Sequence, residues 1–347
     1  MRVKIIGAGI FGCMIAGELK RAGHEVVLIE KNSDIMQGAS KFNHNRIHFG
    51  FHYPRSLSTA QQSLEGLITF FLKFKEAIVS EFPNFYMISK ENSFITGEEY
   101  IYFCDRAQIS YALEYPPTSL VNRDRISHSL RVREPVFDYD ILYALVKEEI
   151  KGVELRLNTP WDGESEDADF IVNASYESIN QVSQTLGVPP LALKFQDVII
   201  PIFTIKEKKV GLTVMDGLGT ERLPFSSIMP KGFKKNTFLL YSPRHSVLSE
   251  SPHNNFREKS SEPAITKMYR GAQRFFPFLK YASPAGHWRT IRALPVNDND
   301  ERLSEIFVDP SCPALINVLS GKISTCAKVA LEVRHLIENN MHKSLVV

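Results

Sequence analysis

The first thirty positions of the chain carry three successive patterns of apolar and polar residues. Positions 3–6 form a short apolar run, which is typical of a buried parallel strand. Positions 14–21 have helical composition and end near Gly23, and positions 25–29 form a second run rich in β-branched residues. The pattern predicts a strand, a turn, a helix and a second strand, in that order.

The middle of the chain mixes strand-like and helical segments. Residues 85–103 and 196–209 have strand composition, with many Tyr, Phe, Thr and Ile side chains. Residues 246–263 are polar and predict an exposed loop. A helix and two strands are predicted, in that order, at residues 138–150, 153–157 and 170–174.

The composition is that of an ordinary globular protein. The 347 residues are enough for two lobes, and 44% of them are hydrophobic and 23% charged. A net charge of +2 gives no reason to expect a nucleic-acid or membrane surface. Three glycines interrupt the apolar N-terminal run and Glu18 and Lys20 end it, so neither a secretory signal nor a membrane span is predicted. The four cysteines form no CxxC pair, which favours a reduced, cytoplasmic setting.

The turn between the first strand and the helix contains three glycines in the spacing of a dinucleotide-binding loop. Gly7 permits a tight turn, Gly9 lets a pyrophosphate approach the backbone, and Gly12 allows close packing of the helix on the strand. The free N–H groups at the helix start face the anion. Glu30 ends the second strand, where a carboxylate accepts hydrogen bonds from ribose hydroxyls. These features predict a bound dinucleotide without distinguishing FAD from NAD.

The C-terminal region predicts a second turn of the same kind. Residues 315–319 are a strand candidate, residues 320–322 form a glycine turn, and a helix capped by Ser324 or Thr325 runs through residues 330–337. A glycine turn before a helix N-terminus suits another polar part of a ligand, although a plain strand–helix unit has the same pattern.

With these motifs, the chain resembles the D-amino-acid-oxidase-like superfamily of FAD-dependent oxidoreductases, and within it most closely the L-2-hydroxyglutarate oxidase branch. The match is strong in the predicted cofactor-binding part and weak across residues 85–135 and 192–285. Besides the glycine loop and Glu30, it rests on a small-residue turn at Gly38, Ala39 and Ser40, on an N-x-x-x-I-H-x-G-x-x-Y pattern at Asn43, Ile47, His48, Gly50 and Tyr53, on residues 172–176, and on residues 320–322.

The resemblance implies an α/β fold in which a Rossmann-type FAD/NAD(P)-binding domain is joined to a substrate domain with a mixed antiparallel sheet. The FAD-binding domain would be discontinuous and comprise residues 1–84, 136–191 and 286–347, with residues 85–135 and 192–285 as the substrate or cap domain. The residues expected to bind FAD are Gly7, Gly9, Ile10, Phe11, Gly12, Glu30, Lys31, Ser40, Asn43, Arg46, Ala174, Gly321, Lys322 and Ile323.

One position departs from some relatives of the family. These relatives hold the flavin covalently through a histidine just after the small-residue turn, and Phe42 occupies that place here. The sequence therefore predicts that the FAD is bound without a covalent bond.

The segment "HNRIHFGFHYP", residues 44–54, contains three of the ten histidines of the chain. In an extended chain its residues alternate, so that His44, His48 and His52 share one face with Arg46. That face permits three interpretations: a metal site, a half-buried strand, or a basic strip that faces the flavin. No carboxylate or thiol joins the histidines locally and the resemblance implies no metal, so no metal is predicted.

The chemistry of flavin reduction favours the basic strip. Oxidation of a carbon that bears O–H or N–H requires a base for the heteroatom proton, and a histidine with a pKa near 6.5 suits that role. His48 and His52 are the candidates for this base. Arginine binds carboxylates in bidentate fashion, so the anion-binding candidates are Arg46, Arg289 and Arg292, whereas Tyr241 and Arg244 are interpreted as surface residues at a strand end.

The functional hypothesis is an FAD-dependent oxidoreductase that oxidises a CH–OH or CH–NH group of a small, anionic or sugar-like substrate, with His48, His52 and Arg292 as the catalytic residues. Two alternatives remain open: redox-neutral flavin chemistry of the sugar-mutase kind, and a dinucleotide-binding protein without turnover. The oligomeric state has no signal in the sequence.

Overall fold

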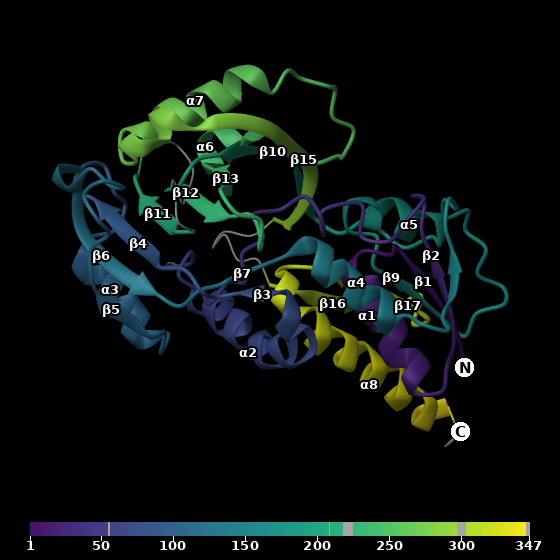
Figure 1. The fold of residues 1–347 in the computed structure, drawn as a ribbon. Coiled ribbons are helices and arrows are strands. Elements are labelled where there is room, and N and C mark those ends of the chain that lie inside the picture. The colour runs from purple at the N-terminus through teal and green to yellow at the C-terminus, as the bar shows by residue number, and fades with distance from the viewer. Residues whose placement is uncertain (55, 208, 218–224, 297–302, 345–347) are drawn as a thin grey trace.

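A six-stranded, mostly parallel sheet forms one part of the computed structural model (Figure 1), which describes residues 1–54, 56–207, 209–217, 225–296 and 303–344. The strand order is β16-β17-β9-β1-β2-β8, and only β16 runs antiparallel to its neighbour. The strands are β1 (Arg2–Ile6), β2 (Glu25–Ile29), β8 (Glu154–Arg156), β9 (Phe170–Asn173), β16 (Glu305–Val308) and β17 (Leu315–Leu319).

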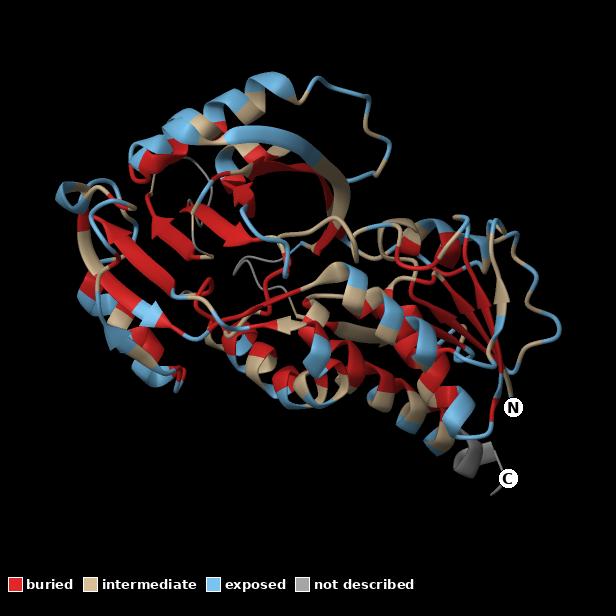
Figure 2. Ribbon diagram, viewed as in Figure 1, coloured by how far each residue is buried: buried red, intermediate tan, exposed pale blue. Residues whose placement is uncertain are grey.

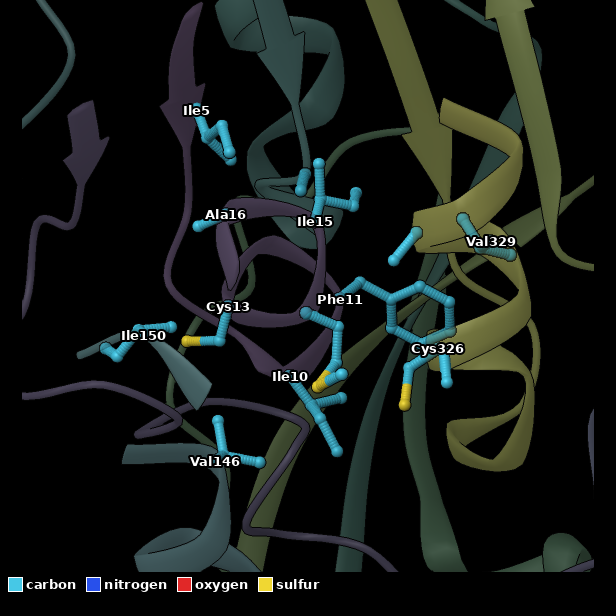
Figure 3. Packing of buried hydrophobic residues seen from close by; sticks show 14 of the residues in the cluster. Ile5, Ile10, Phe11, Cys13, Ile15, Ala16, Val146, Ile150, Cys326 and Val329 are labelled. Atoms are coloured by element: carbon cyan, nitrogen blue, oxygen red, sulfur yellow. The ribbon is translucent and has the colours of Figure 1, made fainter. Parts of the chain in front are cut away.

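Helices cover both faces of this sheet, because its strands are apolar on both sides. Val3 and Ile5 of β1 point into the larger core, whereas Ile6 points into a smaller cluster on the opposite face. Figure 3 shows the larger core, where Phe11 reaches across to Val329. The elements around this core are α1 (Ile10–Arg21), α2 (Leu57–Phe74), η1 (Lys75–Ala77), α4 (Tyr139–Glu149) and α8 (Cys326–Ser344), and the opposite face carries η3 (Tyr176–Ser178) and α5 (Ile179–Thr185).

A nine-stranded sheet forms the other part of the molecule. Its main path runs β14-β10-β13-β12-β11-β4-β6-β5, and β15 pairs with β10. All pairs are antiparallel except β4 with β11, so the sheet is mixed. The strands are β4 (Asn84–Ser89), β5 (Tyr111–Leu113), β6 (Ile126–Val132), β10 (Leu193–Thr204), β11 (Gly211–Met215), β12 (Phe225–Pro230), β13 (Thr237–Tyr241), β14 (Val247–Ser251) and β15 (Ser283–Pro295).

The two faces of the nine-stranded sheet have different partners. One face packs its buried side chains, such as Phe203 and Leu240, against α7 (Glu262–Gln273) and η4 (Pro277–Tyr281). The other face packs Tyr86 and Ile200 with α3 (Gly97–Arg106) and with the segment around Phe51. Figure 2 shows that most strands of the nine-stranded sheet are buried. The remaining short elements are η2 (Arg123–Arg125), α6 (Pro243–Ser246), η5 (Ile323–Thr325) and a two-stranded sheet of β3 (Ile78–Val79) and β7 (Val136–Phe137).

The predicted fold class is confirmed, and several predicted elements need correction. Residues 85–103 were expected to be strands throughout, but only the first part is β4, and a capping box of Thr96 and Glu99 starts α3. Residues 246–263 were expected to be a loop, but they begin with edge strand β14 and enter α7. Among the described residues, no helix combines the length and apolar composition that a bilayer span requires.

Two predicted domain boundaries fall inside strands: the boundary after residue 84 cuts β4, and the boundary before residue 286 cuts β15. Residues 286–295 were assigned to the cofactor-binding domain, yet they belong to β15, which pairs with β10 in the nine-stranded sheet. The resemblance was weak across residues 192–285, directly before this segment, and a single glycine is the turn signal at residue 286.

Candidate functional site

A cavity of about 870 Å³ is lined by residues from both parts of the molecule. The six-stranded part contributes the turn after β1, the end of β2 and the turn after β17, and the nine-stranded sheet contributes β10, β13 and β15. A cavity of this size, with apolar walls and a few polar groups, is typical of ligand sites. The predicted FAD-binding residues that line it are Gly7, Gly9, Ile10, Phe11, Glu30, Lys31, Ser40, Asn43, Arg46, Ala174, Gly321, Lys322 and Ile323.

The glycine loop brings backbone N–H groups to one end of the cavity. Gly7 has a positive φ of 97°, and a Cβ there would lie 2.8 Å from the carbonyl oxygen of Ala174. A Cβ on Gly12 would lie only 1.9 Å from the carbonyl oxygen of Gly7, which explains why helix α1 needs glycine at that position although the residue does not line the cavity. The Ile10 N–H donates to the Ser40 hydroxyl at 3.0 Å, so the small-residue turn closes over the start of α1. This backbone cradle suits a pyrophosphate.

Glu30 supplies the carboxylate at the end of β2. One of its oxygens accepts a hydrogen bond from the N–H of Ala8 at 2.7 Å, and the other accepts from the N–H of Asn32 at 2.9 Å. The side chain is largely buried yet lines the cavity, which fits a ribose-binding carboxylate. The neighbouring Lys31 forms an ion pair with Glu177 at 2.9 Å across the cavity rim.

Two further turns complete the cofactor end of the cavity. Asn43 donates to the carbonyl oxygens of Ala39 and Ser40 at 3.1 Å, so it stabilises the small-residue turn. At the C-terminal turn, the N–H of Gly321 donates to the Ser304 hydroxyl at 2.8 Å, and η5 continues into α8. The Lys322 ammonium lies 4.3 Å from the centroid of the Tyr53 ring.

The histidine segment is not a strand. Residues 44–54 form a single backbone bridge, between Arg46 and Val136, and then turn at Gly50, whose φ is +102°. The prediction of an extended strand is therefore wrong, because the turn at Gly50 ends the alternation. All three histidines nevertheless line the cavity, and Ile47 and Phe51 are buried in different cores, whereas Tyr53, expected on the opposite face, lines the cavity as well.

Arg46 is held inside the protein by a network of hydrogen bonds. Its Nη1 donates to Glu134 Oε2 at 2.9 Å and to the Tyr86 hydroxyl, and its Nη2 donates to Thr213 at 3.0 Å and to Ser227 at 2.6 Å. Both side chains of the Arg46–Glu134 pair are fully buried. The structure thus gives Arg46 an internal ion pair where the sequence suggested an open anion ligand.

His52 is buried beside the same network. Its Nδ1 lies 2.5 Å from the Tyr86 hydroxyl oxygen, and that hydroxyl donates to Glu134 Oε2 at 2.6 Å. Burial lowers the pKa of His52 well below its ordinary value, and the nearby positive charge of Arg46 lowers it further. Burial likewise lowers the pKa of His44 to about 3. Both imidazoles are therefore neutral at physiological pH.

A metal is disfavoured at this position although the ligand types are present. Candidate ligand atoms of His48, His52 and Glu134 all lie within 4.8 Å of one another. However, Glu134 already accepts hydrogen bonds from Arg46, from Tyr86 and from the N–H of Phe49 at 2.8 Å. A metal cation would have to compete with the Arg46 guanidinium for this carboxylate, so the geometry favours the hydrogen-bond network.

Arg292 of β15 lies on the wall of the cavity formed by the nine-stranded sheet. Its Nη2 donates to the Tyr241 hydroxyl, and its guanidinium carbon lies 5.3 Å from the centroid of the Tyr241 ring. The Nε of Arg292 is buried and has no hydrogen-bond partner within the described part of the chain. Arg292 thus lines the cavity with a guanidinium that is only partly engaged by other side chains.

The other two arginines considered from the sequence have different positions. Arg289 does not line the cavity, and it forms a bidentate ion pair with Asp197 at 2.7 and 2.9 Å. Alternation along β15 explains this, because residues an odd number of positions apart point to opposite faces. Arg244 is exposed and does not line the cavity, as expected of a surface residue.

The sequence did not predict the positions of three residues that lie in or beside the cavity. Tyr241 was interpreted as a surface residue, but it is buried and lines the cavity beside Arg292. Tyr86 and Glu134 carried no local signal, because each meets the histidines only when the nine-stranded sheet folds against residues 44–54. For the positions of β10 and β13 that face the cavity, the sequence indicated a strand but not which residues would line the cavity.

Comparison with known proteins shows to which family the chain is similar. The family model described as FAD dependent oxidoreductase matches residues 2–312. The FAD-dependent monooxygenase FPY4 of Fusarium mangiferae is 24% identical over 340 residues, which cover 92% of this chain and 87% of that protein. The structure of glycine oxidase from Geobacillus kaustophilus superposes with a TM-score of 0.77 at 16% identity, covering 97% of this chain and 95% of the other.

A shorter and more similar match lies in a second fungal protein. The FAD-dependent monooxygenase kojA of Aspergillus flavus is 44% identical over 79 residues, but these cover only 23% of this chain and 18% of that protein. The chain therefore matches less than a fifth of the length of this relative. None of these similarities distinguishes the L-2-hydroxyglutarate oxidase branch, which stays a prediction.

Proposed function

Since this chain belongs to the family of FAD dependent oxidoreductases, we propose that it oxidises a CH–NH or CH–OH group of a small anionic substrate by hydride transfer to FAD. The observation that carries the proposal is that an arginine and a histidine both line the cavity and are connected through two aromatic rings. The ring of Phe225 has its centroid 4.5 Å from that of His52 and 5.7 Å from that of Tyr241, on which Arg292 packs.

The residues of this wall suit the two tasks that such a reaction requires. When bound, FAD supplies the acceptor for two electrons and a proton equivalent. Arg292 holds a substrate carboxylate through its unpaired Nε and its outer nitrogens. A histidine, His48 or His52, accepts the proton of the substrate N–H or O–H. Val198, Ile200 and Phe225 line the same wall and keep water away from the reacting carbon.

The substrate class follows from the charge of the wall. An arginine with a free nitrogen in a partly buried site favours a carboxylate over a neutral group. A carbon next to that carboxylate, carrying an amino or a hydroxyl group, is the simplest substrate that reaches both Arg292 and the histidines. The glycine oxidase of Geobacillus kaustophilus is named for an amino acid substrate, which supports an amino acid as the first class to test.

The setting we propose is a reduced compartment, the cytoplasm. All four cysteines of the chain are free, and Cys13, Cys104 and Cys326 are buried. Free buried thiols are usual in reducing compartments.

An anaerobic substrate screen tests the proposed function. Purified protein is mixed with amino acids, 2-hydroxy acids and the amides of the same compounds, and bleaching of the flavin absorbance is followed. We expect an acid to reduce the flavin at lower concentrations than its amide does. In Arg292→Met the KM for the acid should rise roughly 10- to 100-fold, the loss of a charge-assisted hydrogen bond, while the KM for the amide stays unchanged.

The matched control is Arg244→Met, which removes an exposed arginine that does not line the cavity. Equal activity on acid and amide in the unmodified protein would contradict the role of Arg292. Product formation without net bleaching would indicate redox-neutral chemistry. Incorporation of an oxygen atom from O₂ into the product would indicate instead the activity for which the fungal relatives are named.

A further inference from the structure

The hydroxyl of Tyr86 lies at the centre of three side chains that are all buried. It contacts Nδ1 of His52 at 2.5 Å, receives a hydrogen bond from Nη1 of Arg46, and donates to Glu134 at 2.6 Å. Tyr86, Glu134 and the side chain of Arg46 are almost completely inaccessible to solvent. Because no water competes for these bonds, each proton in the network has a defined position.

The charge of Glu134 determines where the Tyr86 proton lies. Burial is the largest influence and raises the pKa of Glu134 above its ordinary value, although the Arg46 guanidinium, the Tyr86 hydroxyl and the Phe49 N–H act in the opposite direction. All three are donors directed at the carboxylate, and an ionised carboxylate is the form that only accepts. The Tyr86 proton therefore points to Glu134. The opposite orientation would bring two lone pairs together at 2.6 Å.

The tautomer of His52 follows from this proton. A tyrosine hydroxyl has a single proton, and Tyr86 gives it to Glu134. Arg46 Nη1 lies 3.4 Å from Nδ1 of His52, but its two protons are directed to Tyr86 and Glu134. Nδ1 of His52 therefore carries a proton of its own to bond the Tyr86 oxygen. In a neutral imidazole the other nitrogen, Nε2, is then unprotonated. His52 lines the cavity, and Nε2 is the ring nitrogen that the contact with Tyr86 does not involve.

We propose that Tyr86 and Glu134 are positioning residues that lock His52 in the Nδ1–H tautomer and thereby make its Nε2 the base of the reaction. The catalytic part of this inference rests on the proposed function, whereas the tautomer lock does not. The fixed tautomer also distinguishes His52 from the other candidate base, His48. Nδ1 of the half-buried His48 lies 3.8 Å from Glu134, which is beyond hydrogen-bond distance, so this carboxylate does not fix the His48 ring as it fixes His52 through Tyr86.

The proposed step balances with FAD as the oxidant. The X–H bond of the substrate breaks, where X is nitrogen or oxygen, and its proton passes to Nε2 of His52. The C–H bond breaks with its electron pair, which leaves as hydride to the oxidised FAD, and a C=X double bond forms in the product. Burial and the Arg46 guanidinium, whose Nη1 lies 3.4 Å from Nδ1, oppose the positive charge that His52 gains. The path from Nδ1–H through Tyr86 to the carboxylate of Glu134 acts in the opposite sense, as an acidic partner does for the imidazolium in hydrolase triads.

Nitrogen-15 NMR of histidine-labelled holoprotein tests the lock without any substrate. The ¹⁵N chemical shift distinguishes a protonated ring nitrogen from an unprotonated one, and the His52 signals are assigned by their absence in His52→Asn. We expect a single Nδ1–H tautomer for His52 in the unmodified protein and a mixture of tautomers in Tyr86→Phe. The control is Tyr100→Phe, which removes another buried hydroxyl, bonded to the Phe51 carbonyl at 2.8 Å, and should leave the tautomer unchanged.

Anaerobic flavin reduction, measured per bound FAD, tests the catalytic part. His52→Asn keeps an N–H donor for Tyr86 but removes the base, so reduction should slow roughly 10²- to 10⁴-fold. Tyr86→Phe should slow it at least tenfold, and Tyr100→Phe should not. An Nε2–H tautomer in the unmodified protein, or an unchanged tautomer in Tyr86→Phe, would overturn the lock. If the lock is observed but His52→Asn reduces FAD at the normal rate, the catalytic role of His52 is wrong although the oxidation itself stands.

Discussion

The glycine loop of residues 7–12 and the histidine segment of residues 44–54 line the same cavity, but they keep their shapes by different means. The loop is held by backbone geometry, through the positive φ of Gly7 and the contact of Gly12 with the Gly7 carbonyl. The histidine segment is held by side chains from distant strands: Arg46 binds Tyr86, Thr213 and Ser227 of the nine-stranded sheet.

This difference separates the two functions of the cavity. A backbone cradle binds a cofactor that all members of the family share, and it needs only a local pattern of glycines. The chemistry of the substrate depends on side chains whose pKa values and tautomers are adjusted by buried neighbours. Substitutions in the two regions should therefore have different effects. Loss of the buried ion pair between Arg46 and Glu134 should have the largest.

The largest expected effect is on stability, in Arg46→Met. This substitution leaves the Glu134 carboxylate buried without its counterion, which typically costs about 3–5 kcal/mol of unfolding free energy. The measurement is urea unfolding at saturating FAD, followed by tryptophan fluorescence. Arg131→Met is the matched control, since its partner Glu114 and its own side chain are about half exposed, and it should cost less than about 1 kcal/mol.

A second variant keeps this prediction testable if Arg46→Met does not fold. Arg46→Met combined with Glu134→Gln removes both charges and should recover part of the lost stability. If Arg46→Met is as stable as Arg131→Met, the histidine segment is held by packing alone, and the contrast with the glycine loop fails.

A smaller effect is expected on FAD affinity, in Glu30→Ala. The carboxylate would bond the ribose and also accepts the Ala8 N–H within the loop, so its loss should weaken FAD binding by roughly 1–3 kcal/mol. Titration of the apoprotein with FAD gives the Kd. Glu25→Ala, at the exposed start of the same strand, should leave the Kd unchanged. An unaltered Kd in Glu30→Ala would show that the backbone cradle alone determines affinity.

The smallest expected effect is on the attachment of the flavin. Phe42 lines the cavity where some relatives carry an attachment histidine, and its ring packs near Trp288 at 6.1 Å between centroids. Acid precipitation should therefore release all the flavin into the supernatant. A washed precipitate that stays yellow would contradict this prediction and would point to His44 or His48 as the attachment residue.

Parts of the molecule with a local signal were predicted well. Strands β2 and β17 have the predicted bounds, and β1 and α1 begin earlier than expected but enclose the predicted glycine turn. Predictions failed where partners are distant in sequence, as for Tyr241, and one failed although its signal is local. Residues 97–106 are a helix because Thr96 and Glu99 form a capping box, a signal that was present in the sequence and was outweighed by the aromatic composition.

The sequence by itself determined the cofactor end of the cavity. Its glycine loop, the acid at the end of β2 and the turn after β17 are short motifs that can be recognised within a few residues of sequence, although Glu30 accepts from Ala8 and Gly321 donates to Ser304. Only the tertiary structure decided the substrate end, because the nine-stranded sheet brings Tyr86, Glu134 and Tyr241 to the histidines and to Arg292. The physical reason is that burial and a neighbouring charge determine whether a histidine is a base and whether an arginine is free to bind an anion, and neither property belongs to the residue alone.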